Sequence, residues 1–127
     1  MAFHHTVAQL LYQSQRARRD IQTAVSFLTT QVREPDEDDW GKVKRVLKYL
    51  KSTHTMPLRL EIQQLRKPMW DIDVAHSVHM DCKGQTGAGM TFGRGAVMLL
   101  CRKQKVNTRS STETELVGVD DAIGSVL

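Results

Sequence analysis

Four carboxylates stand in two pairs whose spacing could support metal-dependent chemistry. Asp71 and Asp73 lie in "MWDIDVAHSV", where apolar and polar residues alternate as they do in a β-strand. Residues two apart in a strand point to the same face of a sheet, so these two carboxylates share a face. Glu113 and Glu115 lie in "SSTETEL", at the start of a segment with helical spacing. Carboxylates from a strand and a facing helix can bind Mg²⁺, and two-metal hydrolysis of phosphodiesters needs several of them.

The two glutamates differ in what the local pattern requires of them. Ser110 and Glu113 have the spacing of a capping box, so Glu113 is explained as a helix cap without any catalytic role. Glu115 is not needed for the cap. It lies on or beside the helical face that carries Leu116, Val119, Ala122 and Ile123, where a carboxylate is costly unless it is paired or bound to a cation. The pattern alone still favours a solvated surface glutamate, and a lone Asp-x-Asp is also typical of a polar edge strand.

Basic residues form two sets that could contact phosphates. The first set lies in a helical segment and the second follows a predicted strand: Lys44, Arg45 and Lys48, then Arg102, Lys103 and Lys105. Lys and Arg number 18 against 14 Asp and Glu, and the net charge of +4 mildly favours a polyanionic partner. Charge of this size is common in proteins that never bind nucleic acid, and a solvated helix face explains the first set equally well.

Other site chemistries find little support in the sequence. Cys82 and Cys101 are far apart and lack Cys-x-x-Cys spacing, so neither a disulfide framework nor a zinc site is expected. Reduced thiols are typical of an intracellular protein, cytoplasmic or nuclear. His76 and His79 lack the further ligands that would complete a zinc site. No apolar run approaches the length of a membrane span and the start does not have the pattern of a signal peptide, so no membrane partner is expected.

The elements that must position these residues fall into two parts. Helical periodicity runs through 6–18, 20–32 and 35–52, with Asp20 as a plausible cap between the first two segments. The third segment is the clearest helix, because acids crowd its start and bases its end. Its expected apolar stripe is Trp40, Val43, Val46, Leu47 and Leu50. The period then changes to two in 56–65 and 69–78, followed by a hairpin over 86–104 and a helix from about 111. The predicted fold class is α+β, with three helices followed by a mixed sheet and one helix.

The order of these segments resembles a known family. The stretches are "LLYQSQRARRDIQTAVSFLTTQV", "EPDEDDWGKVKRVLKYLKST", "DIDVAHSVH", "KGQTGAGMTFGRGAV" and "RKQKVNTRSSTETELVGVDDA". Together they resemble the polyprotein of copia-type LTR retrotransposons, from the end of the reverse transcriptase into the first part of the ribonuclease H domain. The resemblance covers nearly the whole chain.

The resemblance implies a division of the chain and a candidate site. Residues 1–55 would be the helical, thumb-like end of the reverse transcriptase, and 56–127 a truncated ribonuclease H-like domain. The family activity is Mg²⁺-dependent cleavage of RNA in RNA–DNA hybrids during reverse transcription. By motif position, Asp73 on the first strand and Glu115 on the first helix would be catalytic residues and metal ligands. The implied partners are an RNA–DNA hybrid or other nucleic acid and the missing parts of the polyprotein.

The family pattern also requires acids that this sequence lacks, namely a third aspartate on a further strand and a later fourth acid. We therefore expect the chain alone to be inactive on hybrids. We also expect Asp73 and Glu115 to face each other across one cation, with Asp71 further from Glu115. The alternatives are a non-enzymatic, basic nucleic-acid-binding remnant and an inert transposon relic.

Overall fold

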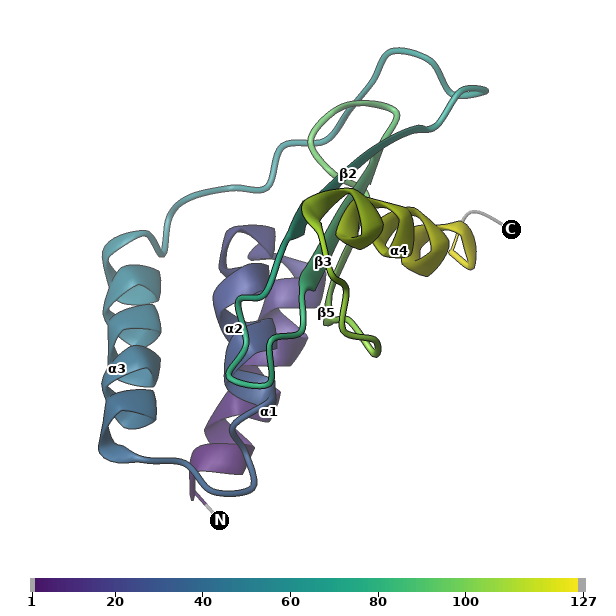
Figure 1. Ribbon diagram of the computed structural model, residues 1–127. Helices are drawn as coiled ribbons and strands as arrows, with labels where there is room; N and C mark the ends of the chain where they lie inside the picture. The colour runs from purple at the N-terminus through teal and green to yellow at the C-terminus, as the bar shows by residue number, and fades with distance from the viewer. Residues whose placement is uncertain (1, 126–127) are drawn as a thin grey trace. The chain divides into compact units, whose positions relative to one another are not determined.

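The structure, a computed structural model, describes residues 2–125 and confirms the α+β class. Helices occupy the first part of the chain and strands with a final helix the second, as Figure 1 shows. The chain divides into two compact units, the first ending at Arg59 and the second beginning at Leu60. The expected boundary lies between residues 55 and 56, slightly earlier in the same connecting segment.

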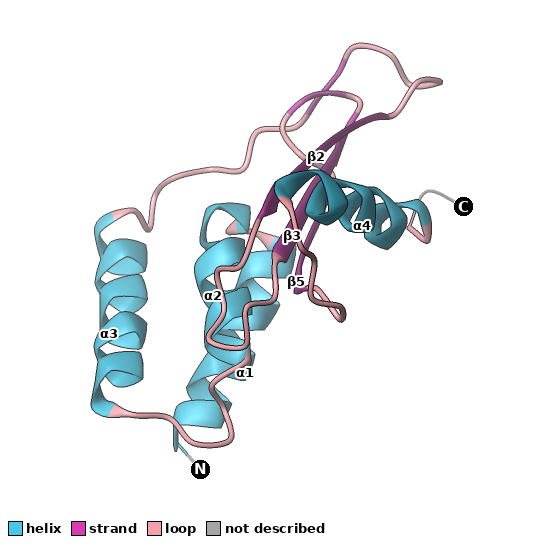
Figure 2. Ribbon diagram, in the orientation of Figure 1, coloured by secondary structure: helices cyan, strands magenta, loops and turns pink. Residues whose placement is uncertain are grey.

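The first unit is built from helices, drawn in cyan in Figure 2. They are α1 (Ala2–Arg16), the short 3₁₀ helix η1 (Arg19–Ile21), α2 (Gln22–Thr29) and α3 (Glu37–Ser52). Phe3, Val7, Leu10 and Ser14 recur on one face of α1 and are buried, as an amphipathic helix requires. The core joins residues of all these helices: Phe3, Val7, Leu10, Ile21, Val25, Leu28, Val43 and Val46.

The apolar stripe expected on α3 is only partly buried. Val43 and Val46 are in the core, whereas Trp40 and Leu50 are partly buried and pack against it. Leu47 is 45% exposed. Trp40 makes an edge contact with Phe3, with ring centroids 5.2 Å apart and an angle of 78° between the ring planes. The indole therefore covers the rim of the core rather than filling its centre.

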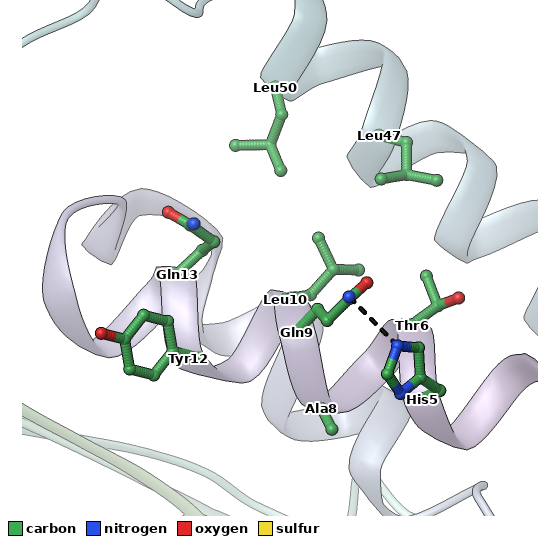
Figure 3. A pocket seen from close by; sticks show the side chains of 9 residues that line it. All are labelled: His5, Thr6, Ala8, Gln9, Leu10, Tyr12, Gln13, Leu47 and Leu50. Atoms are coloured by element: carbon green, nitrogen blue, oxygen red, sulfur yellow. Dashed lines mark hydrogen bonds between the residues drawn. The ribbon is translucent and has the colours of Figure 1, made fainter.

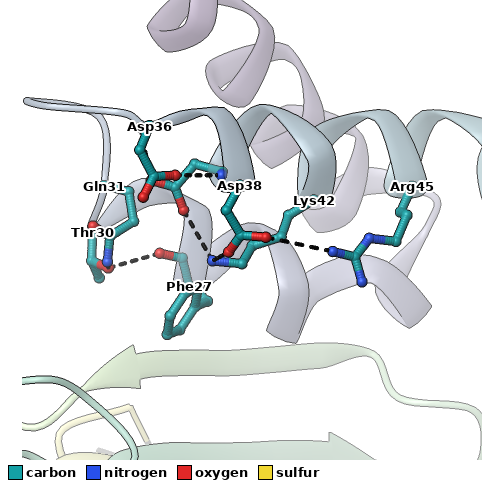
Figure 4. Close-up of polar contacts among 8 residues, drawn as sticks. Phe27, Thr30, Gln31, Asp36, Asp38, Lys42 and Arg45 are labelled. Carbon is teal, nitrogen blue, oxygen red and sulfur yellow. Dashed lines mark hydrogen bonds and ion pairs between the residues drawn. The ribbon is translucent and has the colours of Figure 1, made fainter.

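Asp36 and Asp39 cap the start of α3 reciprocally. The Asp39 backbone N–H donates to Asp36 Oδ1 at 2.7 Å, and the Asp36 backbone N–H donates to Asp39 Oδ2 at 3.3 Å. Lys42 Nζ then pairs with Asp38 at 2.8 Å and with Asp39 at 3.1 Å, as Figure 4 shows for the labelled residues. The hydrogen bond from Lys42 lowers the pKa of the Asp38 carboxyl. These contacts fix the first turns of α3.

Arg18 joins the end of α1 to the end of α3. Its Nη1 donates to Thr53 O at 3.0 Å and its Nη2 to Thr53 Oγ1 at 2.6 Å. The same guanidinium pairs with Asp20, with Nη2 to Oδ2 at 2.7 Å, and lowers the pKa of that carboxyl. The expectation that Asp20 caps a helix is wrong, because its carboxylate is held by Arg18 and the N-cap of α2 is Ile21 without a side-chain bond.

The second unit contains a three-stranded antiparallel sheet in the order β2-β3-β5, with a separate two-stranded pair of β1 and β4. The elements are β1 (Glu61–Ile62), β2 (Met69–Ala75), β3 (Gln85–Thr91), β4 (Gly93–Arg94), β5 (Met98–Lys103) and α4 (Ser111–Ile123). In the sheet register, Asp73 lies opposite Gly87, which lies opposite Cys101. The expected second strand and the expected hairpin are confirmed, and Gly95 in the turn has a φ of 81°, a value that favours glycine.

The expected strand over 56–65 is mostly absent. Only β1 forms there, and its two residues pair with β4. Leu58, Leu60 and Ile62 alternate as predicted but are 39%, 53% and 63% exposed. A strand needs a partner along its length as well as alternation, and within 56–65 the strand β4 pairs with only Glu61 and Ile62.

Candidate functional site

Helix α4 packs on one face of the sheet through its small residues. Figure 1 shows it lying over the strands, and its buried residues are Thr114, Gly118 and Ala122. A Cβ at Gly118 would collide with Val74 Cγ1 and lie 3.8 Å from Ile72 Cγ2. The face of β2 that carries Ile72 and Val74 is therefore the one that meets the helix.

Asp71 and Asp73 lie on the opposite face of the sheet. The β2–β3 pairing is continuous from Met69 to Ala75, so successive side chains alternate without a bulge. Both aspartates are exposed, and Asp73 Oδ1 accepts the Val74 backbone N–H at 2.9 Å. The prediction that the two share a face is confirmed. The prediction that Asp73 faces the helix is wrong, since Val74 occupies that position.

Glu115 is exposed on α4, beside the buried Thr114. The apolar residues of α4 that were expected to make a charge at Glu115 costly are themselves largely exposed to solvent. Leu116 is 68% exposed, Val119 43% and Ile123 48%. Small side chains let the helix approach the sheet closely, so the face of Thr114 and Gly118 turns inward. Glu115 is placed as a solvated glutamate would be.

Glu113 caps α4, although not as a closed box. The Glu113 backbone N–H donates to Ser110 Oγ at 3.2 Å. The Glu113 carboxylate accepts the backbone N–H of Arg109 at 2.7 Å, where a closed capping box would use the N–H of Ser110. The carboxylate thus satisfies a backbone donor just before the helix, and it needs no other role.

The residues present do not fit one Mg²⁺ shared between Asp73 and Glu115. Such an ion needs oxygen ligands at about 2.0–2.1 Å. Asp73 points away from the sheet face that α4 covers, and Glu115 belongs to α4. Within residues 2–125, no group of three or more His, Cys, Asp or Glu side chains could hold a metal ion. We therefore derive no catalytic step through a metal bound by this pair.

A buried polar network that the sequence did not reveal holds α4 on the sheet. Gln104, 1% exposed, donates from Nε2 to Thr86 Oγ1 at 3.0 Å and to the backbone oxygen of Thr114 at 3.1 Å. Thr86 Oγ1 in turn donates to Asp121 Oδ2 at 2.9 Å. A Cβ at Gly84 would lie 2.5 Å from Gln104 Oε1, so this position requires glycine. The only sequence signal was the place of Gln104 in the "RKQ" motif.

Two of the three bases in the second basic set are engaged in ion pairs. Arg102 Nη2 donates to the backbone oxygen of Asp121, and its Nε lies 3.5 Å from Asp121 Oδ1. Lys103 Nζ lies 2.8 Å from Asp81 Oδ2 and lowers the pKa of that carboxyl. Lys105 is exposed. Arg102 and Lys103 therefore have acidic or backbone partners within the second unit, and their charges stabilise that unit.

The first basic set is more open. Lys44, Arg45 and Lys48 are all exposed on α3. Arg45 Nη2 lies 3.9 Å from Asp38 Oδ1, and both side chains are mostly exposed, so that pair contributes little (Figure 4). Among the described residues, no ion pair engages Lys44 or Lys48. These three residues, the α3 basic face, are open to solvent.

A groove of about 590 Å³ lies between α1 and α3. Figure 3 shows Leu10, Leu47 and Leu50 on its walls, with the hydrogen bond of 3.1 Å between Gln9 and His5 along one side. The lining is largely apolar, and its titratable side chains are His5 and Tyr12.

Comparison with known proteins gives three informative similarities. The chain is 28% identical over 120 residues to the retrovirus-related Pol polyprotein from transposon TNT 1-94 of Nicotiana tabacum, covering 94% of this chain and 9% of that protein. It is 30% identical over 124 residues to a putative transposon Ty5-1 protein of Saccharomyces cerevisiae, covering 95% of this chain and 40% of that one. It is also 28% identical to the secreted RxLR effector protein 161 of Plasmopara viticola, over 91% of this chain and 82% of the effector.

Two of these similarities relate the sequence of this chain to those of transposon proteins. The chain spans less than half the length of both transposon relatives. No family model and no solved structure matches it. None of the helices described for residues 2–125 is long and apolar enough to cross a membrane.

Proposed function

We propose that the chain derives from the junction of reverse transcriptase and ribonuclease H in a copia-type polyprotein. The observation that carries this proposal is similarity to two transposon proteins over 94% and 95% of the chain, which takes in both structural units. A helical unit followed by an antiparallel sheet with one packed helix is the order that the family resemblance implies.

In the intact family enzyme the activity would be Mg²⁺-dependent cleavage of RNA in RNA–DNA hybrids, with Asp73 and Glu115 assigned by motif position. The chain alone is inactive in this proposal, for two reasons. Two-metal cleavage needs acids beyond these two. The placement of Asp73 on the face away from α4 also gives no support to a cation shared with Glu115.

Contact with nucleic acid is the part of the function that this chain can perform by itself. The α3 basic face carries three exposed positive charges, and the chain has a net charge of +4. Such a surface neutralises phosphates without reading bases, so binding is independent of sequence and falls with salt. An RNA–DNA hybrid is the partner that the family resemblance implies.

The test measures the binding of a fluorescently labelled hybrid to the full chain by anisotropy, between about 50 and 200 mM salt. One variant carries Lys44→Glu and Lys48→Glu. The matched control carries Arg66→Glu and Lys67→Glu, which changes the net charge equally at two other exposed residues. We expect the first variant to bind more weakly and to reduce the salt slope by about two, since each duplex contact contributes about 0.9. The control should change binding far less.

Equal loss in both variants would mean that net charge, and not the α3 basic face, determines binding. No binding at low salt would favour the inert relic. The genomic reading frame on either side of this chain gives an independent test of origin. A continuous frame that encodes the missing acids would support an active polyprotein, whereas stop codons would support a decayed copy.

A further inference from the structure

His76 connects the end of β2 to the first turn of α4. It directly follows the last residue of the strand, and its Nδ1 lies 2.7 Å from Thr114 Oγ1. Thr114 is fully buried, with an exposed fraction of 0%. Its hydroxyl oxygen also lies 2.9 Å from the Ser110 backbone oxygen and 2.6 Å from Thr108 Oγ1. Thr108 Oγ1 itself lies 3.3 Å from His76 Nδ1, close enough to be a second acceptor for a proton there. The Thr114 hydroxyl therefore has three short polar contacts.

The protons available to this cluster can be assigned in only one way. The Ser110 backbone oxygen has no proton, so the Thr114 hydroxyl must donate to it. Thr114 has then used its single proton, and the contact with Thr108 requires the Thr108 hydroxyl to donate. For the same reason, the contact with His76 requires a proton on Nδ1. Any other assignment leaves two lone pairs facing each other at hydrogen-bond distance.

We infer that His76 carries its proton on Nδ1 and donates it to Thr114 Oγ1. This hydrogen bond, called the clasp below, joins the end of β2 to the first turn of α4. In the neutral imidazole the other nitrogen, Nε2, is then the acceptor. His76 as a residue is exposed, whereas Thr114 is buried. The ring thus joins a buried hydroxyl to the surface of the unit.

The clasp acts at the point where α4 is also held from the other side. Gln104 Nε2 donates to the Thr114 backbone oxygen at 3.1 Å, so Thr114 is bound through both its backbone and its side chain. The inference depends on the protons of this cluster and holds whether or not the proposed function is correct.

The experiment measures the imidazole ¹⁵N chemical shifts of the full chain, labelled at histidine, at a pH where His76 is neutral. We expect the His76 signals to be those of the Nδ1–H tautomer, which is fixed by the hydrogen bond that Nδ1 makes. The double variant Thr108→Val/Thr114→Val removes both hydroxyls that contact Nδ1, and its signals should move towards the Nε2–H tautomer. Thr114→Ser retains the hydroxyl and should retain Nδ1–H.

A second pair of variants tests the clasp by a measurement that does not use the imidazole signals. The amide nitrogen of asparagine can take the place of Nδ1, whereas that of glutamine takes the place of Nε2. We expect His76→Asn to preserve amide hydrogen-exchange protection in the first turns of α4. His76→Gln should raise exchange there by about tenfold, the effect of losing one net hydrogen bond.

A wild-type spectrum of the Nε2–H tautomer, or the averaged signals of a freely rotating ring, would overturn the inference. So would an Nδ1–H tautomer that persists in Thr108→Val/Thr114→Val, or equal exchange in the asparagine and glutamine variants. The wild-type spectrum decides the tautomer by itself if any variant fails to fold.

Discussion

Val74 of β2 lies directly against Gly118 of α4, so closely that a Cβ at Gly118 would collide with Val74 Cγ1. This contact determines which face of β2 meets the helix. Because the strand is regular, Asp73 must then point to the other face. The close approach of helix and sheet thus separates the two carboxylates that the family resemblance assigns to one site.

Gly118→Ala should destabilise the second unit. Alanine favours helix by about 1 kcal/mol over glycine, but overpacking against Val74 should cost about 1–3 kcal/mol. The free energy of unfolding can be measured in urea from Trp70 fluorescence, in a Trp40→Phe background. Gly41→Ala is the matched control, followed by Trp40 in a Trp70→Phe background, because a Cβ there meets nothing within 4 Å and should stabilise α3. A stabilising Gly118→Ala would show that α4 does not approach β2 closely.

Helices and strands whose residue pattern is local could be predicted from the sequence. Val7, Leu10 and Ser14 on α1 have helical spacing and are buried together. The two faces of β2 are also as predicted, because alternation follows from the backbone alone. Alternation does not encode which face of a strand the next element covers. The placement of Asp73 towards the helix rests on the family resemblance instead, and the contact of Gly118 with Val74 contradicts it.

The remaining differences depend on long-range packing. Leu58 and Ile62 alternate as a strand does, yet β1 pairs only with Gly93 and Arg94 of β4, which lie far away in sequence. In α4 the predicted apolar face includes Leu116, which is 68% exposed, whereas Gly118 is buried against the sheet because it permits a closer approach. The Gln104 network joins positions 18 and 10 residues apart in sequence, which no local pattern reports.

Asp20→Asn should reduce the stability of the first unit at neutral pH by about 1 kcal/mol, through loss of the charged hydrogen bond with Arg18. The folded-state pKa of Asp20 is lowered from 3.8, so its contribution is fully present above that value and is lost as pH falls through the lowered pKa. Urea unfolding at several pH values, followed by Trp40 in a Trp70→Phe background, should show the two proteins converging in acid. A constant difference down to about pH 2 would contradict this.

Trp40→Ala should destabilise the first unit by about 1–3 kcal/mol. Full burial would give about 3–5 kcal/mol, but the indole is only partly buried and contacts Phe3 by an edge. Trp40→Phe should retain part of that contact and have a smaller effect. Thermal unfolding followed by circular dichroism measures both variants. Equal stability of Trp40→Ala and the wild type would show that the indole does not pack on the core.

Replacing both Leu116 and Ile123 with Gln should reduce self-association at little cost in stability. The two side chains are 68% and 48% exposed, so the free energy of unfolding should change by less than about 1 kcal/mol. Light scattering at increasing concentration measures association, because exposed apolar stripes promote it. Ala122→Gln is the contrasting variant, since Ala122 is 0% exposed and a larger side chain there should unfold the unit.

The most direct test is a cleavage assay on an RNA–DNA hybrid with Mg²⁺, at a chain concentration that saturates binding. The account predicts that the hybrid is bound through the α3 basic face and stays intact, because Asp73 and Glu115 do not share a cation. Asp73→Asn should bind the hybrid as the wild type does. Mg²⁺-dependent cleavage that Asp73→Asn abolishes would contradict the account, and so would a complete absence of hybrid binding at low salt.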